Sequence, residues 1–350
     1  MTTTTPALII DSAGAGFRQG LIERRELRSD DVLIDIAYAG ICHSDIHTVR
    51  EEWGPCIFPI VTGHEIAGVV REIGSEVTNF AVGDHVGVGC IVDSCGECEY
   101  CTTGHENFCT KGMVGTYNAR NYDGEVAQGG YSQQIVVGER HVLRIPDAIP
   151  LEVAAPLLCA GITLYTPLKR WGAGPGKQVA IIGMGGLGHM GVKIAAAMGA
   201  DVTVISQTMS KEADGRAFGA IDYAATEDPT VFKKLRGRFD LIVCTVSADL
   251  PLDRYLSMVK PFGALVLVGL PEKPQSFQVF SLIMGDKVLA ASNIGGIEGT
   301  QEMLDFCAEH GIAPMVEQIS ADEVEAAYDR VVASKVRYRF VIDTSTITPK

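Results

Sequence analysis

The first part of the chain is patterned in short apolar segments separated by glycine and proline. Strand-length runs cover 31–38 (DVLIDIAY) and 66–73 (IAGVVREI), and a further β-rich run covers 86–92. Turn residues close these runs, such as Gly74 after the second run and the pair Gly83-Asp84 before the third. Short strands at this spacing predict a barrel-like β domain.

The pattern changes after Pro150, where strand-length apolar runs begin to alternate with helix-length amphipathic segments. Strands are expected at 179–182, 202–205, 241–244 and 265–268, and helices at 187–198 and about 252–259. This alternation predicts a parallel sheet covered by helices on both faces. An amphipathic helix over 300–310 and a strand over 339–342 are expected nearer the C-terminus.

Length and charge narrow the class of protein. A chain of 350 residues exceeds the usual size of one hydrophobic core, so two domains are expected. The net charge of −14 argues against a nucleic acid or an anionic membrane as partner. No apolar run is long enough to span a bilayer, the best being 264–270, and the N-terminus has no secretory signal. We therefore expect a cytoplasmic protein that acts on small molecules.

A glycine-rich turn follows the expected strand at 179–182 and opens the helix at 187–198. Its residues are Gly183, Met184, Gly185, Gly186, Leu187 and Gly188. In a strand–turn–helix context the first glycine permits the turn, the second lets the backbone approach a pyrophosphate, and the last allows close helix packing. The helix N-terminus then offers N–H groups to the phosphates. The turn predicts dinucleotide binding, with a purely structural turn as the alternative.

The end of the next strand indicates which dinucleotide is bound. NAD enzymes usually place an acidic residue there to bind the adenosine ribose 2′-OH. Here the strand ends in Ser206, Gln207 and Thr208, with Lys211 shortly after. Two hydroxyls and an ammonium group suit the 2′-phosphate of NADP, which a carboxylate would repel. The sequence therefore predicts NADP(H), with an ordinary solvated loop as the alternative.

The ten cysteines are unevenly spread, and seven of them lie between Cys42 and Cys109. In a reducing compartment, clustered cysteines indicate metal before disulfides. Four of them, Cys95, Cys98, Cys101 and Cys109, have a spacing that can close a tetrahedral zinc site with no open position. An iron–sulfur cluster is the alternative, but the proline that follows the last cysteine in bacterial ferredoxins is absent. A structural zinc is predicted.

A second, dispersed group contains the ligand types of a catalytic zinc. Cys42, His64 and Cys159 would supply one imidazole and two thiolates, leaving a fourth position for water or an alcohol. Taken singly, each residue could instead be an ordinary core residue. Their spacing alone does not join positions so far apart.

Nearly the whole chain resembles the zinc-containing medium-chain alcohol dehydrogenases, especially the cinnamyl alcohol dehydrogenase branch with its bacterial broad-specificity aldehyde reductases. The matching segments are 40–47 (GICHSDIH), 63–65 (GHE), the four-cysteine lobe, 128–130 (QGG), 155–163 (APLLCAGIT), 183–191 and 336–342 (VRYRFVI). This resemblance implies a GroES-like β-barrel catalytic domain into which a doubly wound Rossmann domain is inserted. The fold class is thus α/β plus β, with residues 1–155 and 294–350 in the catalytic domain and 156–293 in the NADP-binding domain.

The resemblance also assigns the dispersed residues to a catalytic centre. It implies that Cys42, His64 and Cys159 hold the catalytic zinc and that Glu65 lies beside the ion, where it can exchange with bound water. Asp45 would orient the ligating histidine; the alternative is a helix N-terminal acid. With the four-cysteine site, two zinc ions per chain are expected.

Further roles follow from the same resemblance. Ser44 would take the alcohol proton and His47 would pass it to solvent, since the pKa of histidine lies near working pH. Cofactor contacts are implied for His43, Thr163, Val246, Val268, Ser292 and Asn293. A homodimer formed through the Rossmann sheets is expected by analogy.

The substrate pocket departs from the plant enzymes. Two positions that are aromatic there appear here as Gly115 and Asn293, and Trp53 either walls the cleft or belongs to the core. These departures favour a broad aldehyde reductase that interconverts primary alcohols and aldehydes. The alternatives are a non-catalytic relative, a zinc-free quinone or enoyl reductase, and an NAD-dependent secondary-alcohol or polyol dehydrogenase. The three-ligand set with Ser44 and His47 argues against the first alternative, and both cysteine groups argue against the second. The end of the strand at Ser206 discriminates against the third.

Overall fold

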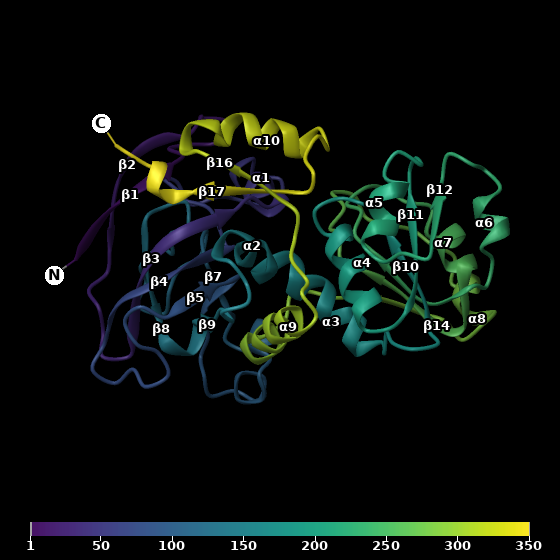
Figure 1. Ribbon diagram of the computed structural model, residues 1–350, viewed down its shortest axis with the longest axis horizontal. Coiled ribbons are helices and arrows are strands. Elements are labelled where there is room, and N and C mark those ends of the chain that lie inside the picture. The colour runs from purple at the N-terminus through teal and green to yellow at the C-terminus, as the bar shows by residue number, and fades with distance from the viewer. Residues whose placement is uncertain (1, 350) are drawn as a thin grey trace. The chain divides into compact units, whose positions relative to one another are not determined.

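The computed structural model describes residues 2–349 and separates into two compact units. The β-rich unit comprises Met1–Cys159 and Gly295–Lys350, and the central unit comprises Ala160–Ile294. The two ends of the chain therefore belong to one unit. Figure 1 shows this directly, because purple and yellow ribbons lie together within the same unit.

The main sheet of the β-rich unit joins strands from both ends of the chain. Its order is β16-β17-β3-β4-β5-β9, with β8 paired to β3. The strands are β3 (Asp31–Gly40), β4 (Ile66–Ile73), β5 (His85–Val88), β8 (Gln134–Gly138), β9 (Leu143–Arg144), β16 (Val316–Ile319) and β17 (Arg339–Asp343). β17 lies antiparallel to β3, with Val341 opposite Gly40. The expected strands at 31–38, 66–73 and 339–342 are confirmed.

Two small antiparallel sheets complete the strands of this unit. They are β1 (Thr3–Ile9) with β2 (Arg18–Arg24), and β6 (Ile91–Asp93) with β7 (Val114–Gly115). The β-rich run expected at 86–92 is divided between β5 and β6. The division falls at Gly89, where a Cβ atom would lie only 2.9 Å from the carbonyl oxygen of Leu158.

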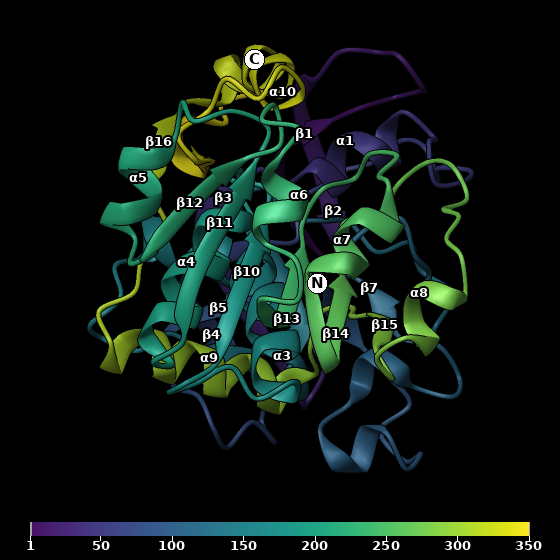
Figure 2. The same ribbon diagram turned by 90° about the vertical axis from the view of Figure 1, so that its right-hand side faces the viewer.

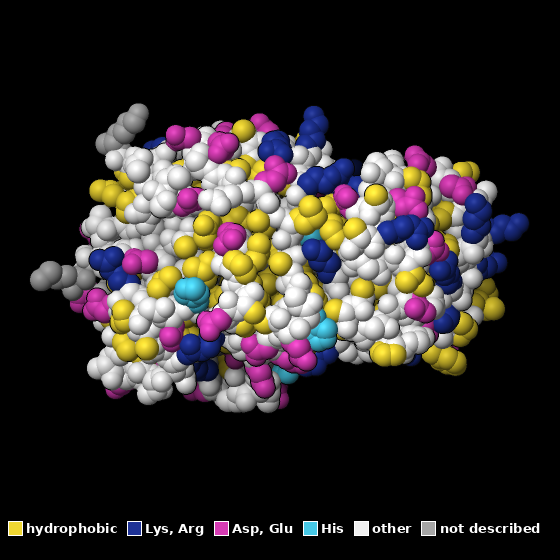
Figure 3. All heavy atoms as spheres, in the orientation of Figure 1, with side chains coloured by type: hydrophobic (Ala, Val, Ile, Leu, Met, Phe, Trp, Pro, Cys, Tyr) yellow, Lys and Arg dark blue, Asp and Glu magenta, His cyan; other side chains and the backbone are white. Residues whose placement is uncertain are grey.

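Helices of the β-rich unit are mostly short. They are α1 (His43–Val49), α2 (Leu151–Pro156), α9 (Ile297–Glu309) and α10 (Val324–Val332), with the turns η1 (Cys101–Thr103), η2 (Glu106–Phe108), η3 (Glu139–His141), η5 (Ala321–Glu323) and η6 (Thr344–Thr346). The helix expected at 300–310 is α9. Its acidic side chains at 298, 302, 305 and 309 are exposed, while Met303, Leu304 and Cys307 are buried. Figure 3 shows acidic side chains gathered at this place.

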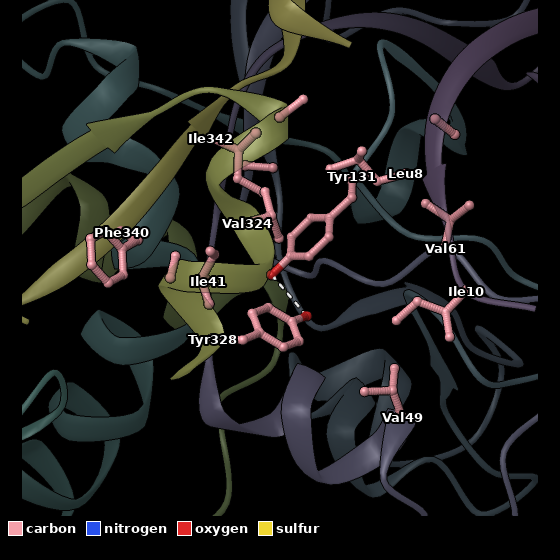
Figure 4. Packing of buried hydrophobic residues seen from close by; sticks show 14 of the residues in the cluster. Leu8, Ile10, Ile41, Val49, Val61, Tyr131, Val324, Tyr328, Phe340 and Ile342 are labelled. Atoms are coloured by element: carbon pink, nitrogen blue, oxygen red, sulfur yellow. Dashed lines mark hydrogen bonds between the residues drawn. The ribbon is translucent and has the colours of Figure 1, made fainter. Parts of the chain in front are cut away.

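One hydrophobic cluster of this unit packs α1 and α10 against strands from both ends of the chain. It includes Leu8, Ile41, Val324, Phe340 and Ile342, all buried. Figure 4 shows their side chains surrounding two tyrosines whose hydroxyl groups point toward each other. The C-terminal segment therefore forms part of the core in which the N-terminal strands are packed.

The central unit is a parallel sheet in the order β12-β11-β10-β13-β14-β15, which is the strand order 3-2-1-4-5-6 of a dinucleotide-binding fold. The strands are β10 (Gln178–Ile182), β11 (Asp201–Ser206), β12 (Asp222–Ala225), β13 (Phe239–Cys244), β14 (Val259–Leu267) and β15 (Val288–Ala291). Figure 2 shows these strands side by side in that order. The expected parallel sheet is confirmed.

Helices cover both faces of this sheet. They are α3 (Ile162–Arg170), α4 (Gly188–Ala197), α5 (Glu212–Ala217), α6 (Val231–Lys234), α7 (Leu252–Met258) and α8 (Phe280–Ile283). In Figure 1 the sheet is seen nearly edge-on, with α3 and α4 on one face and α6 and α7 on the other. The helices expected at 187–198 and about 252–259 correspond to α4 and α7.

One helical stretch, Leu151–Arg170, was not expected from the sequence. It consists of α2, the π-helical turn η4 (Leu157–Gly161) and α3. By length and composition it could cross a membrane, with a mean hydropathy of 1.4, although the sequence predicted no such stretch. However, 78% of the most apolar window is buried inside the structure, as in the core helix of a globular fold.

Candidate functional site

Four ligand-type side chains from distant parts of the sequence meet inside the β-rich unit. One donor atom from each of Cys42, His64, Glu65 and Cys159 lies within 4.8 Å of all the others, and all four residues are buried. The two sulfurs are 4.0 Å apart, and His64 Nε2 is 3.2 Å from Cys159 Sγ. Tetrahedral coordination of zinc by sulfur and nitrogen would separate such atoms by about 3.6–3.8 Å. The donor set therefore fits a zinc ion.

Three kinds of local structure bring these donors together. Cys42 is the residue before α1, and His64 lies between Gly63 and strand β4. Cys159 lies on the π-helical turn η4, directly after Pro156 ends α2. Proline has no N–H to donate within a helix, and π-helical turns are often found at functional sites. The turn thus places the Cys159 thiol where a regular helix would not.

Asp45 both caps helix α1 and orients His64. Its Oδ1 lies 3.2 Å from His64 Nδ1, so that Nε2 is directed toward the sulfurs. Its Oδ2 accepts a hydrogen bond of 2.8 Å from the backbone N–H of Cys42 at the start of α1. The sequence left two interpretations of Asp45, a partner of the histidine and an acid at the helix N-terminus, and both apply here. The carboxylate fixes the positions of two of the four donors.

Glu65 forms a buried ion pair with Arg339, a residue to which the sequence analysis gave no role. Glu65 Oε1 pairs with the Arg339 guanidinium, while Glu65 Oε2 has no hydrogen-bond partner among the described residues. Burial raises the pKa of Glu65 to about 7, although the guanidinium acts in the opposite direction. Only the position of Arg339 within the segment 336–342 could have pointed to it. A buried carboxylate in this group, with one oxygen that lacks a hydrogen-bond partner among the described residues, suits a role near a cation.

The thiols of this cluster are electrostatically coupled. The hydrogen bond from Cys159 holds the pKa of Cys42 well below its usual value, and sharing that bond raises the pKa of Cys159. Burial alone would lower the pKa of His64, but the negative charges of Cys90 and Asp45 raise it well above its usual value. Cys90, which sequence reasoning did not single out, is therefore a neighbour of this site. Metal ligation requires thiolates and a neutral imidazole, so a cation would replace protons here.

The other cysteine cluster is local in sequence. One sulfur from each of Cys95, Cys98, Cys101 and Cys109 lies within 4.8 Å of the others. The sulfurs of Cys98 and Cys101 are 3.5 Å apart, and Cys109 Sγ accepts a hydrogen bond from the backbone N–H of Cys95. Gly96, with φ +73°, supplies a left-handed turn that most residues would adopt only with strain. Four thiols, joined by no further donor among the described residues, match a closed structural zinc site.

Helix α1 carries the residues expected to move a proton. Ser44 Oγ is 3.6 Å from Cys42 Sγ. The His47 ring stacks on Trp53 at 4.6 Å, and its Nδ1 pairs with the Glu52 carboxylate. Trp53 is exposed, so it is not a core residue. His43, expected at the cofactor, is also on α1 and outside the ligand group; burial lowers its pKa.

The glycine turn of the central unit has the expected geometry between β10 and α4. Gly183 has φ +93°, and a Cβ atom there would lie 2.6 Å from Thr245 Oγ1. A Cβ at Gly188 would overlap the carbonyl oxygen of Gly183, whereas a Cβ at Gly185 would meet open space. Gly186 and Leu187 complete the turn, with Leu187 as the N-cap of α4. The turn thus leaves its backbone accessible where a pyrophosphate would approach.

The serine-ended strand β11 lies beside this turn. Ser206 is the last residue of β11, and Gln207 and Thr208 follow it. Lys211 Nζ donates a hydrogen bond of 2.7 Å to the carbonyl oxygen of Met184. The ammonium group is therefore held at the glycine turn rather than extended into solvent. The remaining expected cofactor residues follow other parallel strands: Val246 follows β13, Val268 follows β14, and Ser292 and Asn293 follow β15, while Thr163 is buried in α3.

The fold and the two groups of ligands define a class: a dehydrogenase with a dinucleotide-binding sheet and two thiolate-rich metal sites. Family models described as "Alcohol dehydrogenase GroES-like domain" and "Zinc-binding dehydrogenase" match residues 28–147 and 186–309. The chain belongs to the zinc-binding alcohol dehydrogenase family and is an oxidoreductase.

Three similar proteins illustrate the relationship. A probable formaldehyde dehydrogenase of Bacillus subtilis is 60% identical over 343 residues, covering 98% of each chain. An NADP-dependent alcohol dehydrogenase of Mycolicibacterium smegmatis is 58% identical over 346 residues, covering 99% of each chain. The solved structure of a cinnamyl alcohol dehydrogenase from Sorghum bicolor has a TM-score of 0.95 at 40% identity, covering 99% of each chain. The expected fold and branch are thus confirmed.

Proposed function

We propose that this protein is a zinc-dependent, NADP(H)-using alcohol dehydrogenase that mainly reduces aldehydes to primary alcohols and accepts both aliphatic and aromatic substrates. The observation that carries the proposal is the buried group of Cys42, His64 and Cys159, with His64 oriented by Asp45. Two thiols and one imidazole are the protein ligands of a catalytic zinc that keeps a position open for substrate. The four-cysteine lobe would hold the second ion.

A zinc ion held there would polarise a bound carbonyl group and lower the pKa of a bound alcohol. Ser44 is placed beside Cys42, where its hydroxyl would donate a proton to the oxygen of the reacting aldehyde. His47, on the same short helix, would restore that proton from solvent, and its pairing with Glu52 would hold the ring in place. The dinucleotide supplies the hydride, and the protein supplies orientation.

Three features support NADP(H) over NAD(H). Strand β11 ends in Ser206 rather than an acidic residue, and Lys211 is held at the glycine turn. The 58% identical relative from Mycolicibacterium smegmatis is named NADP-dependent. A 2′-phosphate would be bound by hydroxyl groups and an ammonium group, with no carboxylate at the strand end to repel it.

The proposal extends to assembly and location. Strand β15 is an edge of the central sheet. The neighbouring helix α8 exposes Phe280 and Ile283 by 65 and 63%, and Met284 directly after it is exposed by 67%. Figure 2 shows α8 next to β15. An exposed apolar patch beside a free edge strand favours a homodimer that joins two such edges. A solution mass of one chain, measured by light scattering, would contradict the dimer.

We place the enzyme in the cytoplasm, where its thiols stay reduced.

The decisive experiment measures metal content and then activity. We expect about two zinc ions per chain and faster reduction of a panel of aldehydes, including formaldehyde and aromatic aldehydes, with NADPH than with NADH. Active enzyme with less than one zinc per chain would overturn the proposal.

A single substitution tests the cofactor assignment. Ser206→Asp places a carboxylate where the 2′-phosphate would bind, so we expect the ratio of kcat/KM with NADPH to that with NADH to fall by about tenfold or more, ~1.4 kcal/mol. Ser257→Asp adds the same charge in α7 and should leave the ratio unchanged. An unchanged ratio in Ser206→Asp would show that the end of β11 does not select the cofactor.

A further inference from the structure

A buried tyrosine completes the hydrogen bonding of Asp45. Tyr131 donates from its hydroxyl to Asp45 Oδ2 at 3.0 Å, and both residues are fully buried. The same carboxylate accepts from the backbone N–H groups of Cys42 at 2.8 Å and Gly63 at 3.1 Å, and it faces His64 Nδ1 at 3.2 Å. A carboxylate has about four acceptor sites, and all four are used here. Removing one donor would leave a buried oxygen undersatisfied.

The direction of the bond from Tyr131 is fixed by its neighbours. A carboxylate facing two N–H groups and an imidazole N–H can only accept, so the Tyr131 hydroxyl must donate to it. That hydroxyl accepts in turn from the hydroxyl of Tyr328 at 3.5 Å, and the Tyr328 hydroxyl lies 3.4 Å from Thr62 Oγ1. Figure 4 shows the two tyrosine hydroxyls facing each other. The result is a chain of hydroxyl groups from Thr62 through two tyrosines to Asp45.

The chain lies in a water-excluded core. Tyr131 and Tyr328 belong to the hydrophobic cluster that includes Val61, Val324 and Phe340. The Phe17 ring packs against both tyrosine rings, at 6.2 and 5.1 Å between centroids. In such surroundings a hydrogen bond is stronger than in water, and an unpaired polar group is more costly. The donated bond is therefore worth more here than on the surface.

Backbone geometry holds the Tyr131 ring against the segment that carries His64. Gly63 has φ +101°, and a Cβ there would lie 2.5 Å from Tyr131 Cδ1. The backbone N–H groups of Gly129, Gly130 and Tyr131 donate to the carbonyl oxygens of Val61, Gly63 and Thr62. The buried Arg24 guanidinium clamps the same segment by donating to the carbonyl oxygens of Gln128, Gly129 and Gln134.

We propose that Tyr131 is a positioning residue of the catalytic centre: its hydroxyl, supported by Tyr328, holds Asp45 in the orientation that aims His64 Nε2 at the metal. This inference rests on the proposed function, because it assumes that His64 ligates a zinc ion. Partners of ligating histidines typically contribute 10–100-fold to metal affinity or activity. Tyr131 bonds to Asp45 rather than to His64 itself, so we expect its contribution to metal affinity at the lower end of that range.

Tyr131→Phe removes the hydroxyl and keeps the ring. We expect zinc release from the buried site to a chromogenic chelator to become about tenfold faster, at the lower end of the effect of such partners. Release from the four-cysteine lobe should not change. With cobalt in the buried site, the visible ligand-field bands should shift. Turnover should fall by a similar factor with KM changed less than twofold, because Tyr131 is fully buried and exposes no surface to a substrate.

Two other tyrosines serve as matched controls. Tyr328→Phe leaves the bond to Asp45 intact and should change release by no more than about threefold, well below the range for direct partners of a ligand. Tyr255→Phe, in the core of the central unit, removes the hydroxyl of another buried tyrosine, which is 5% exposed, and should change nothing at the metal. Equal effects of all three substitutions, or unchanged bands and release rate in Tyr131→Phe, would overturn the inference.

A second variant decides the matter if Tyr131→Phe does not fold. Placing 3-fluorotyrosine at position 131 alone keeps the packing but makes the hydroxyl a stronger donor. A shift of the cobalt bands supports the inference, and unchanged bands with an unchanged release rate overturn it. Failure of the proposed function is distinguishable, because wild-type protein would then bind no metal at the buried site.

Discussion

The two cysteine clusters of the β-rich unit are built in opposite ways. Cys95, Cys98, Cys101 and Cys109 lie on one short segment whose turns bring the sulfurs together. Cys42 and Cys159 are 117 residues apart and meet only because the fold brings them together. The first group consists of four thiols, whereas the second has two thiols, an imidazole and a carboxylate with its own cationic partner.

Their surroundings differ as much as their connectivity. In the lobe, Cys98 is partly exposed, and hydrogen bonds from the backbone of Thr110 and Cys101 lower its pKa to about 5. Two members of the buried cluster are paired with other side chains: His64 with Asp45, and Glu65 with Arg339. Under the proposed assignment, local backbone geometry suffices for the closed site, while the site with an open position needs a layer of oriented side chains.

The largest expected effect comes from removing a ligand of the buried cluster. Cys159→Ser replaces a thiolate by a poor zinc ligand, and we expect kcat to fall at least about a thousandfold, ~4 kcal/mol, because polarisation of the substrate is lost. Zinc content should fall from about two to about one per chain. Steady-state kinetics and metal analysis measure both quantities.

Cys307→Ser is the matched control, because Cys307 is also a buried cysteine, in α9, and belongs to neither cluster. It should keep both ions and activity within about twofold. Retention of two zinc ions and full turnover in Cys159→Ser would remove the buried cluster from the mechanism.

A smaller effect on turnover is expected from removing one thiol of the four-cysteine lobe. Cys98→Ser should also leave about one zinc per chain, but activity should fall less than about tenfold while the free energy of unfolding drops by about 3 kcal/mol. The lobe also caps α9, because Glu106 Oε2 accepts a hydrogen bond of 2.9 Å from the backbone N–H of Ile297. Amide exchange at the start of α9 should therefore accelerate. A loss of turnover as complete as in Cys159→Ser would contradict the division of roles.

The difference between the clusters also explains what the sequence could predict. Four cysteines within fifteen residues indicate a metal site by their spacing alone. The buried cluster was assembled only through family resemblance, because its ligands are scattered between Cys42 and Cys159. Arg339 had no sequence signal of its own, since its partner Glu65 is 274 residues away. Tyr131 and Tyr328 were missed for the same reason.

The secondary structure also separates into elements that the local sequence pattern predicts and elements that depend on tertiary contacts. Strands such as β3, β4 and β10 were predicted because their apolar patterns are long and bounded by turn residues. The two-residue strands β7 and β9 carry no pattern and arise from tertiary pairing. The helical stretch Leu151–Arg170 was missed because Pro156 and Pro167 resemble helix breakers, whereas the structure accommodates both prolines inside buried helix.

The smallest expected effect is on the free energy of unfolding. It comes from a histidine packed next to the four-cysteine lobe, and it depends on pH. His141 is buried, and its Nε2 lies 3.2 Å from the hydroxyl of Ser94, the residue before Cys95. Burial, with a smaller contribution from Arg140, lowers the pKa of His141 to about 4 from its usual 6.5. The folded state therefore favours the neutral ring, so its stabilisation is complete above about pH 6.5 and is lost as pH falls toward 4. Between pH 7 and pH 5.5 this loss amounts to about 1 kcal/mol.

His141→Gln removes the titrating group and should flatten the unfolding free energy over that interval by about this amount, as measured by urea denaturation at each pH. His310→Gln, an exposed histidine at the end of α9, should leave the wild-type slope unchanged. Activity per bound zinc should not differ between the two variants and wild type, because neither histidine belongs to the buried cluster. If His141→Gln kept the wild-type dependence of the unfolding free energy on pH, the acid sensitivity would arise from groups other than His141. The contrast between the surroundings of the lobe and those of the buried cluster would then lose this support.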